Sequence, residues 1–125
     1  MNVRIIGSGV NECIIDGSSS GMIFNASIEK YSLELRNLCI QNGKSSKANT
    51  AGAIYSAGML ITYNVKFQFN SATGSNSAGA IYSIGSLNIS GTAFFNNTLT
   101  APNAEGAAIR TIHNNTTIIG SSFIN

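Results

Sequence analysis

Residues 51–56 read AGAIYS, and the same six letters return at 78–83, which is 27 positions later. The match extends without a gap over residues 51–70 (AGAIYSAGMLITYNVKFQFN) and 78–97 (AGAIYSIGSLNISGTAFFNN). A third copy, GAAIRTIHNNTTIIGSSFIN, begins at Gly106 and has one extra residue in its turn. A period of about 20 to 50 residues is typical of solenoids, propellers and arrays, so it governs the interpretation of every shorter pattern.

Looser copies of the same unit precede the regular ones. Residues 31–43 (YSLELRNLCIQNG) match the second half of a unit, and RIIGSG, ECIIDG and MIFNAS resemble still earlier turns. The 125 residues therefore hold about four and a half units. We expect a single domain over 1–125, with looser coils in 1–50 and regular coils in 51–125. Because neither end carries a polar or helical cap, we expect a piece of a longer solenoid or a stacking subunit.

The units predict an all-β fold. LELRNLCI, LNIS and TTII alternate or run apolar and are rich in aliphatic and β-branched residues, which is typical of short strands. Helical periodicity with capping residues is absent, and a spacing of 27 leaves no room for crossover helices. A hairpin array or propeller needs tighter reversals and longer blades. We therefore predict a parallel β-solenoid in which each unit is one coil, with equivalent residues stacked about 4.8 Å apart.

Stacked coils place each residue beside its own equivalent, which explains why the letters repeat. Small Ala53, Ala80 and Ala108 mark a narrow point, and three further columns are predicted to fill the core. Asn70 and Asn97 are expected to form an asparagine ladder that satisfies buried turn carbonyls. The core columns are Ile54, Ile81 and Ile109; Leu33, Leu60 and Leu87; and Ile40, Phe67, Phe94 and Phe123.

Composition excludes several classes of partner. Only 10% of the residues are charged and the net charge is +2, so we expect no nucleic-acid partner. No charged residue occurs between Phe67 and Ala104, so the surface there must consist of Asn, Ser, Thr and Gly. This surface is common in secreted β-proteins and predicts an extracellular or cell-surface location. No segment is apolar enough to span a membrane, so any signal or anchor would lie outside these residues.

The motifs also resemble a known family. AGAI twice, GAAI, FQFN and FFNN are similar to the GGA(I/L) and FxxN repeats of polymorphic outer-membrane proteins. GSLNISGTAFFNN and LELRNLCIQNG are more similar still to adhesin-like surface proteins of methanogenic archaea, and the resemblance covers essentially the whole chain. It implies a right-handed, single-stranded parallel β-helix that is displayed at the cell surface with adhesive or structural roles and no catalysis. The first motif residue departs from the pattern, since Ala replaces Gly twice.

Catalytic and metal-binding candidates are few. β-Helix lyases and hydrolases gather carboxylates on one outer face, whereas this chain has one Asp and four Glu. Glu34 and Arg36 alternate with core leucines and should point outward as an isolated ion pair. His113 lies in a long turn without a second ligand nearby, so a solvated side chain is favoured over a metal ligand. We expect no catalytic residue, no metal site and no cofactor.

Three other sets of residues have open interpretations. Cys13 and Cys39 are 26 positions apart and could form a disulfide between adjacent coils or remain two buried or half-buried thiols. Tyr55, Tyr82 and Arg110 follow a core column by one residue, so they predict an outward ladder. With Tyr63, that ladder is either a contact strip for a glycan or protein or a stiffener of the sheet. Acceptor sequences for glycosylation occur at Asn25, Asn88, Asn96, Asn114 and Asn115.

Three functions are compatible with these patterns. The first is a non-catalytic extracellular or cell-surface structural or adhesive module, whose partners are flanking coils, a glycan or a cell-surface protein. The second is a self-assembling filament subunit, in which the Ile109–Phe123 end of one copy meets the Val3–Ile15 end of the next. The third is a carbohydrate-binding or carbohydrate-active β-helix protein, which the scarcity of acidic residues disfavours.

Overall fold

The computed structural model describes residues 2–102, 106–112 and 115–125, and these residues form β-strands and connecting turns without a helix. Among these strands β4 and β7 have ten residues each, and the others have two to five. The strands are β1 (Asn2–Ile6), β2 (Ile14–Asp16), β3 (Phe24–Ala26), β4 (Ser32–Gln41), β5 (Lys44–Ser45), β6 (Ile54–Ser56), β7 (Met59–Gln68), β8 (Ser71–Ala72), β9 (Ile81–Ser83), β10 (Leu87–Ser90), β11 (Ala93–Phe95), β12 (Thr98–Leu99), β13 (Ile109–Thr111), β14 (Thr116–Ile119) and β15 (Ser122–Ile124).

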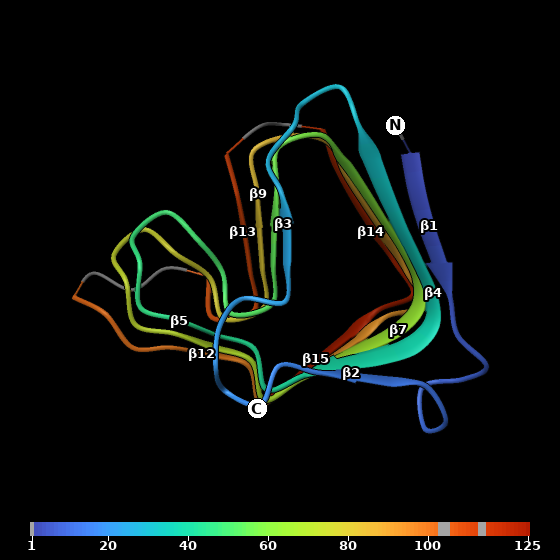
Figure 1. Ribbon diagram of the computed structural model, residues 1–125, viewed down its shortest axis with the longest axis horizontal. Helices are drawn as coiled ribbons and strands as arrows, with labels where there is room; N and C mark the ends of the chain where they lie inside the picture. The colour runs from blue at the N-terminus through green and yellow to red at the C-terminus, as the bar shows by residue number, and fades with distance from the viewer. Residues whose placement is uncertain (1, 103–105, 113–114) are drawn as a thin grey trace.

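All strand pairs are parallel, and each joins one coil to the next. The eight-stranded sheet has the order β1-β4-β7-β10-β14, with β2, β11 and β15 paired along its second half. A four-stranded sheet has the order β13-β9-β6-β3, and a three-stranded sheet the order β12-β8-β5. Seen along the stacking direction, the first two sheets form the three sides of a triangle, and the three-stranded sheet lies in a lobe outside it (Figure 1). The predicted β-solenoid is confirmed, with about four turns of about 27 residues.

Strand register confirms the core columns. Leu60 lies opposite Leu33 and Leu87, and Ile81 lies opposite Ile54 and Ile109. The looser first coil joins the same columns, since Val3, Ile15 and Phe24 oppose Leu33, Ile40 and Ile54. The inner members of these columns form one buried cluster inside the triangle, and Ile15, Phe24 and Ile109 are partly buried against it.

The aromatic column is packed as a stack of rings. Phe67 and Phe94 lie with ring centroids 5.0 Å apart and planes 5° apart, and Phe94 and Phe123 lie 4.8 Å and 3° apart. Below Phe67 the column continues as Ile40, which is fully buried. Because the rings are nearly parallel, each buries a face against the next, and the column forms a continuous stack inside the core.

The asparagine ladder also forms. Nδ2 of Asn70 donates to Oδ1 of Asn97 at 3.0 Å and to the carbonyl of Ile40 at 3.1 Å. Oδ1 of Asn70 accepts from the backbone N–H of Gly43 at 2.9 Å, and Nδ2 of Asn97 donates to the carbonyl of Phe67 at 2.9 Å. Both amides are buried, so the ladder satisfies backbone groups at a corner that water does not reach.

The corners of the solenoid use left-handed backbone conformations that recur in step with the coils. Asparagine tolerates this conformation better than other residues with a side chain, because its short amide can hydrogen-bond locally. Phe69 is the exception, since a bulky aromatic residue occupies a position where Asn stands in the coils on either side. The three corner columns are Asn37, Asn64, Gly91 and Gly120; Asn42, Phe69 and Asn96; and Asn49 and Asn76.

Replacing Phe94 with alanine should lower the free energy of unfolding by about 3 to 5 kcal/mol, because it removes the middle ring of the stack and leaves a cavity. Urea unfolding followed by circular dichroism measures the change. Phe95→Ala provides the matched control, since Phe95 is half-buried on the outer face of the same strand. Equal losses for the two variants would contradict the stack.

Replacing Phe69 with asparagine should raise the free energy of unfolding by about 1 kcal/mol, because the left-handed conformation penalises a bulky side chain by roughly that amount. The same urea titration measures it. Tyr63→Asn is the control, since Tyr63 is an equally exposed aromatic residue in an ordinary strand conformation and should gain nothing. A destabilised Phe69→Asn variant would show that the edge-on contact of Phe69 with Phe95, 5.7 Å between centroids, outweighs the backbone strain.

Candidate functional site

The aromatic ladder that sequence analysis predicted is present on the outer side of the four-stranded sheet. Tyr55, Tyr82 and Arg110 lie opposite one another on β6, β9 and β13, with Asn25 of β3 in the first coil. The rings of Tyr55 and Tyr82 stack at 5.6 Å, and the guanidinium carbon of Arg110 lies 5.9 Å from the Tyr82 centroid. Register and stacking therefore follow the prediction.

The predicted exposure of this ladder is wrong. Tyr82 is only 4% exposed and packs against Ala51 and Ala78, and Tyr55 is half-buried in the same cluster. The cause is the lobe that carries β5, β8 and β12, which lies next to the four-stranded sheet (Figure 1). Ala51 and Ala78 form a parallel β-bridge just before β6 and β9, where the chain returns from the lobe to the four-stranded sheet. The ladder consequently fills the angle between lobe and sheet and is not an open contact strip.

Tyr63 is the member of the candidate strip that remains accessible. Its side chain is 50% exposed on the outer face of the eight-stranded sheet, and the guanidinium carbon of Arg36 lies 5.4 Å from its ring centroid. Met59 and Ile61 share this outward face in the first half of β7, where Met59 is also exposed, and Lys66 and Gln68 point outward in the second half. The first half of the strand thus presents an apolar stripe, and exposed Ile6 and Ile119 lie at the two ends of the same face.

The charged group beside Tyr63 is larger than the isolated pair that the sequence suggested. Glu34 accepts from Nε of Arg4, which lies directly opposite it on β1, as well as from Nε of Arg36 at 2.7 Å. Sequence analysis missed Arg4 because the first coil is irregular, and its step to Glu34 is 30 residues rather than 27. The alternation of NVRII with SLELR was the signal that could have revealed it.

Two carboxyl groups have lowered pKa values, and both are engaged in holding strands together. The hydrogen bonds from Arg4 and Arg36 lower the pKa of Glu34, and those from Gln41, the Ser18 backbone and Asn42 lower the pKa of Asp16. Nε2 of Gln41 and the backbone N–H of Ser18 each donate to Asp16 at 2.7 Å. Both groups are therefore ionised at neutral pH, whereas a general acid needs a raised pKa.

The two cysteines are free thiols, so the disulfide alternative is wrong. Ile14, not Cys13, lies opposite Cys39 in the register of β2 and β4. Cys13 packs against the core cluster, while Cys39 is next to core Ile40 and points to the outer side of the strand. Side chains on opposite faces of a sheet cannot be bridged. Burial raises the pKa of the Cys39 thiol, which disfavours the thiolate form.

The glycosylation acceptors differ in accessibility. Asn25, Asn88 and Asn115 are exposed, whereas Asn96 is half-buried at a left-handed corner. Asn114 and His113 lie outside the described residues. The side chain of Asn115 donates to Oγ of Ser86 at 2.8 Å, which ties it to the preceding coil. Three of the five predicted acceptors are thus sterically open for modification.

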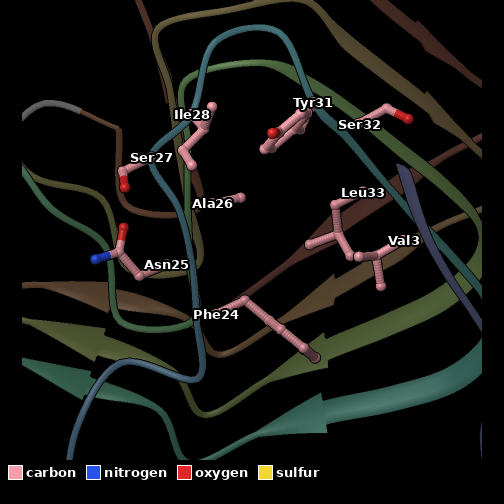
Figure 2. Close-up of a pocket in the computed structure, with 9 residues that line it drawn as sticks. All are labelled: Val3, Phe24, Asn25, Ala26, Ser27, Ile28, Tyr31, Ser32 and Leu33. Carbon is pink, nitrogen blue, oxygen red and sulfur yellow. The ribbon is translucent and has the colours of Figure 1, made fainter. Parts of the chain in front are cut away.

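An apolar hollow lies at the end of the solenoid that contains the first coil. Its volume is about 280 Å3, and Val3, Phe24, Tyr31 and Leu33 point toward it from the sides of the triangle, with Ile28 at its rim (Figure 2). Asn25 and Ser27 point to the other side of their strand (Figure 2). The hollow is therefore the open interior of the first coil, and sequence analysis identified it only as the uncapped end.

A second hollow, of about 310 Å3, lies at the opposite end. Phe94, Asn97, Ala108 and Phe123 line it, so it exposes the upper ends of the aromatic, asparagine and alanine columns. Phe123 and Ile124 are both about half exposed there. The interior of the solenoid is thus accessible at both ends and is closed by packed side chains between them.

Comparisons of the chain with protein-family models, curated protein sequences and solved structures give no significant match. The resemblance to adhesin-like repeat proteins therefore stays a prediction. Across the described residues there is no helix capable of crossing a membrane. The same residues contain no cluster of three or more His, Cys, Asp or Glu side chains that could hold a metal ion.

The paired carboxylate makes a prediction about pH. The carboxyl carbon of Glu34 should titrate by NMR with a midpoint below its ordinary value of 4.5, and Arg4→Ala should move that midpoint upward. Because the pKa is lowered by folding, this contribution to stability is present above pH 4.5 and is lost as the pH falls through the folded-state value. Lys44→Ala, on the remote lobe, should leave the midpoint unchanged. A midpoint of 4.5 or higher in the unaltered chain would refute the network.

Proposed function

We propose that this chain is a non-catalytic structural and adhesive module that acts outside the cell or at its surface. The observation that carries the proposal is the continuity of its columns, in which every coil repeats the packing of the previous one. Such a scaffold extends without changing its cross-section, and stability comes from contacts between neighbouring coils. A rod of this kind suits a protein that displays a surface at a distance or bears load along its axis.

The side chains that could perform chemistry support this role, because they hold the solenoid together. Glu34 bridges β1 and β4 through Arg4, and Asp16 bridges β2 and β4 through Gln41. Gln68 extends the second bridge by donating to Oε1 of Gln41 at 2.6 Å. Each of these contacts joins one coil to the next, so the ionised groups act as axial fasteners on the outside of the rod.

The outer surface supports an extracellular location. Exposed positions in the third and fourth coils include the neutral polar residues Thr73, Ser75, Asn76 and Asn88. Such a surface is soluble without a strong electrostatic field and is compatible with glycosylation at its open asparagines. The adhesive contact is best provided by the eight-stranded sheet, where Tyr63 and Arg36 offer a ring and a guanidinium to a glycan or protein.

The location can be tested with an antibody against the 125-residue chain. Intact cells of the organism that encodes the chain should be labelled, while an antibody against a cytosolic enzyme should label only permeabilised cells. Labelling of this chain only after permeabilisation would overturn the proposed location. Turnover of a polysaccharide that Glu34→Gln abolishes would overturn the non-catalytic role.

Adhesion can be tested with the purified chain immobilised on a surface. Tyr63→Ala should reduce the fraction of cells or glycan-coated beads that the surface retains, because it removes the accessible ring beside Arg36. Met59→Ala is the matched control, since Met59 is 46% exposed at the start of the same strand, four residues before Tyr63. Equal retention by the unaltered chain and Tyr63→Ala would show that this face is not the adhesive contact.

A further inference from the structure

The two ends of the eight-stranded sheet carry unpaired strand edges among the described residues. β1 and β2 pair only with β4, β14 pairs only with β10, and β15 pairs only with β11. Each of these four strands therefore has one edge whose N–H and C=O groups have no strand partner. Unpaired edges above an apolar interior favour the addition of a further strand.

The interior residues at these edges belong to the same columns. Ile118 continues the column that begins with Ile5, and Phe123 continues the column that begins with Ile15. Val3 begins a third column, which ends in Thr116. The β14–β15 edge therefore presents to a second copy the same side-chain columns that an inner coil presents to the next coil of its own chain.

We propose that the β14–β15 edge of one copy of this chain docks on the β1–β2 edge of a second copy, with the strands parallel and the columns in register. Ile118 then packs on Ile5 of the second copy, and Phe123 packs on Ile15. The inference rests on the proposed structural function, because it names the partner that prolongs the scaffold. The contact is head-to-tail, so repeated docking produces an open filament rather than a closed dimer.

The alternative of two identical ends meeting fits the residues less well. A two-fold axis would pair β14 with its own copy in the antiparallel sense, which breaks the parallel register that every pair in this fold uses. In that arrangement Thr116 and Ile118 would no longer continue the side-chain columns of one copy into the other. The head-to-tail arrangement preserves both the register and the side-chain columns.

The shape of the ends limits the strength of the contact. The central path of the eight-stranded sheet has five strands, β1, β4, β7, β10 and β14, whereas the four-stranded sheet has four. When β14 of one copy pairs with β1 of the second copy, a gap one strand deep, about 4.8 Å, therefore remains between β13 and the β3 of the second copy. The hollow beside Phe24 faces this gap. Docking is thus carried by the two sides of the triangle that the eight-stranded sheet forms, without the third, and is weaker than the contact between two coils of one chain.

Four charge substitutions test the proposal by sedimentation velocity over a range of concentrations. Val3→Glu blocks the β1 edge and Ile118→Glu blocks the β14 edge, and both side chains are partly exposed, at 43% and 42%. Ile6→Glu and Ile119→Glu are the matched controls, because they place the same charge on the outer side of the same two strands. Circular dichroism checks that all four variants keep the fold.

We expect the unaltered chain and both controls to associate as their concentration rises. Each blocked variant should associate at least about tenfold more weakly, since a buried charge replaces an apolar contact. A mixture of Val3→Glu and Ile118→Glu should form a one-to-one dimer, because each variant keeps the edge that the other lacks. A monomeric unaltered chain, self-association of Ile118→Glu as tight as that of the unaltered chain, or a monomeric mixture would each overturn the proposal.

Completing the missing strand offers an independent test. A copy of residues 70–85 can be added after Asn125 to supply a fifth strand to the four-stranded sheet. Ile124 lies opposite Phe95, which lies opposite Gln68, so Asn125 is the equivalent of Phe69 and residue 70 continues the coil. The added strand fills the gap, so association should become about tenfold tighter. Unchanged or weaker association would contradict docking in this register. Surface labelling is measured separately, so failure of docking and failure of the proposed location give different results.

Discussion

Parallel pairing between successive coils places every strand residue beside its own equivalent, and this constraint shapes the whole molecule. Apolar side chains satisfy it by stacking, and asparagines satisfy it by bonding amide to amide, but two like charges in one column would repel. In the described strands the constraint is obeyed, since Arg4 opposes Glu34, and Lys66 lies between Cys39 and Ala93. The low charge that suggests an exported protein is therefore also a requirement of the fold, and location has to be decided by experiment.

The same constraint explains which features the sequence could predict. Columns at a constant step of 27, such as Leu33, Leu60 and Leu87, were predictable because a column of identical residues reveals its own register. The first coil was not, because its loops change the step from 27 to 30 at Arg4 and to 25 at Ile15. A ladder position also does not determine exposure: Tyr82 follows the predicted column, yet it packs against Ala51 and Ala78, where the chain returns from the lobe. The path of the lobe depends on contacts between coils, so the strand pattern alone does not reveal this burial.

The lobe has a further effect on function, because it removes one face of the solenoid from contact with partners. The outer side of the four-stranded sheet is filled by the tyrosine ladder, whereas the outer face of the eight-stranded sheet and the two ends remain accessible. The first offers Tyr63 beside an ionised Arg4–Glu34–Arg36 network, and the second offers apolar columns and free strand edges. A lateral contact and an axial contact can therefore coexist without competing for the same residues.

In a solenoid, the structural order of an end coil is linked to its association with another copy. Each coil contacts only its neighbours, so a coil in the middle is stabilised from two sides and an end coil from one. Phe123 stacks on Phe94 through one face of its ring, while Phe94 is covered on both faces by Phe67 and Phe123. A second copy docked on β15 would supply the missing face, so docking would order the end coil and an ordered end coil would favour docking. Association and local stability are then two measures of one interaction, and a substitution such as Ile118→Glu must weaken the first without disturbing the buried coils below.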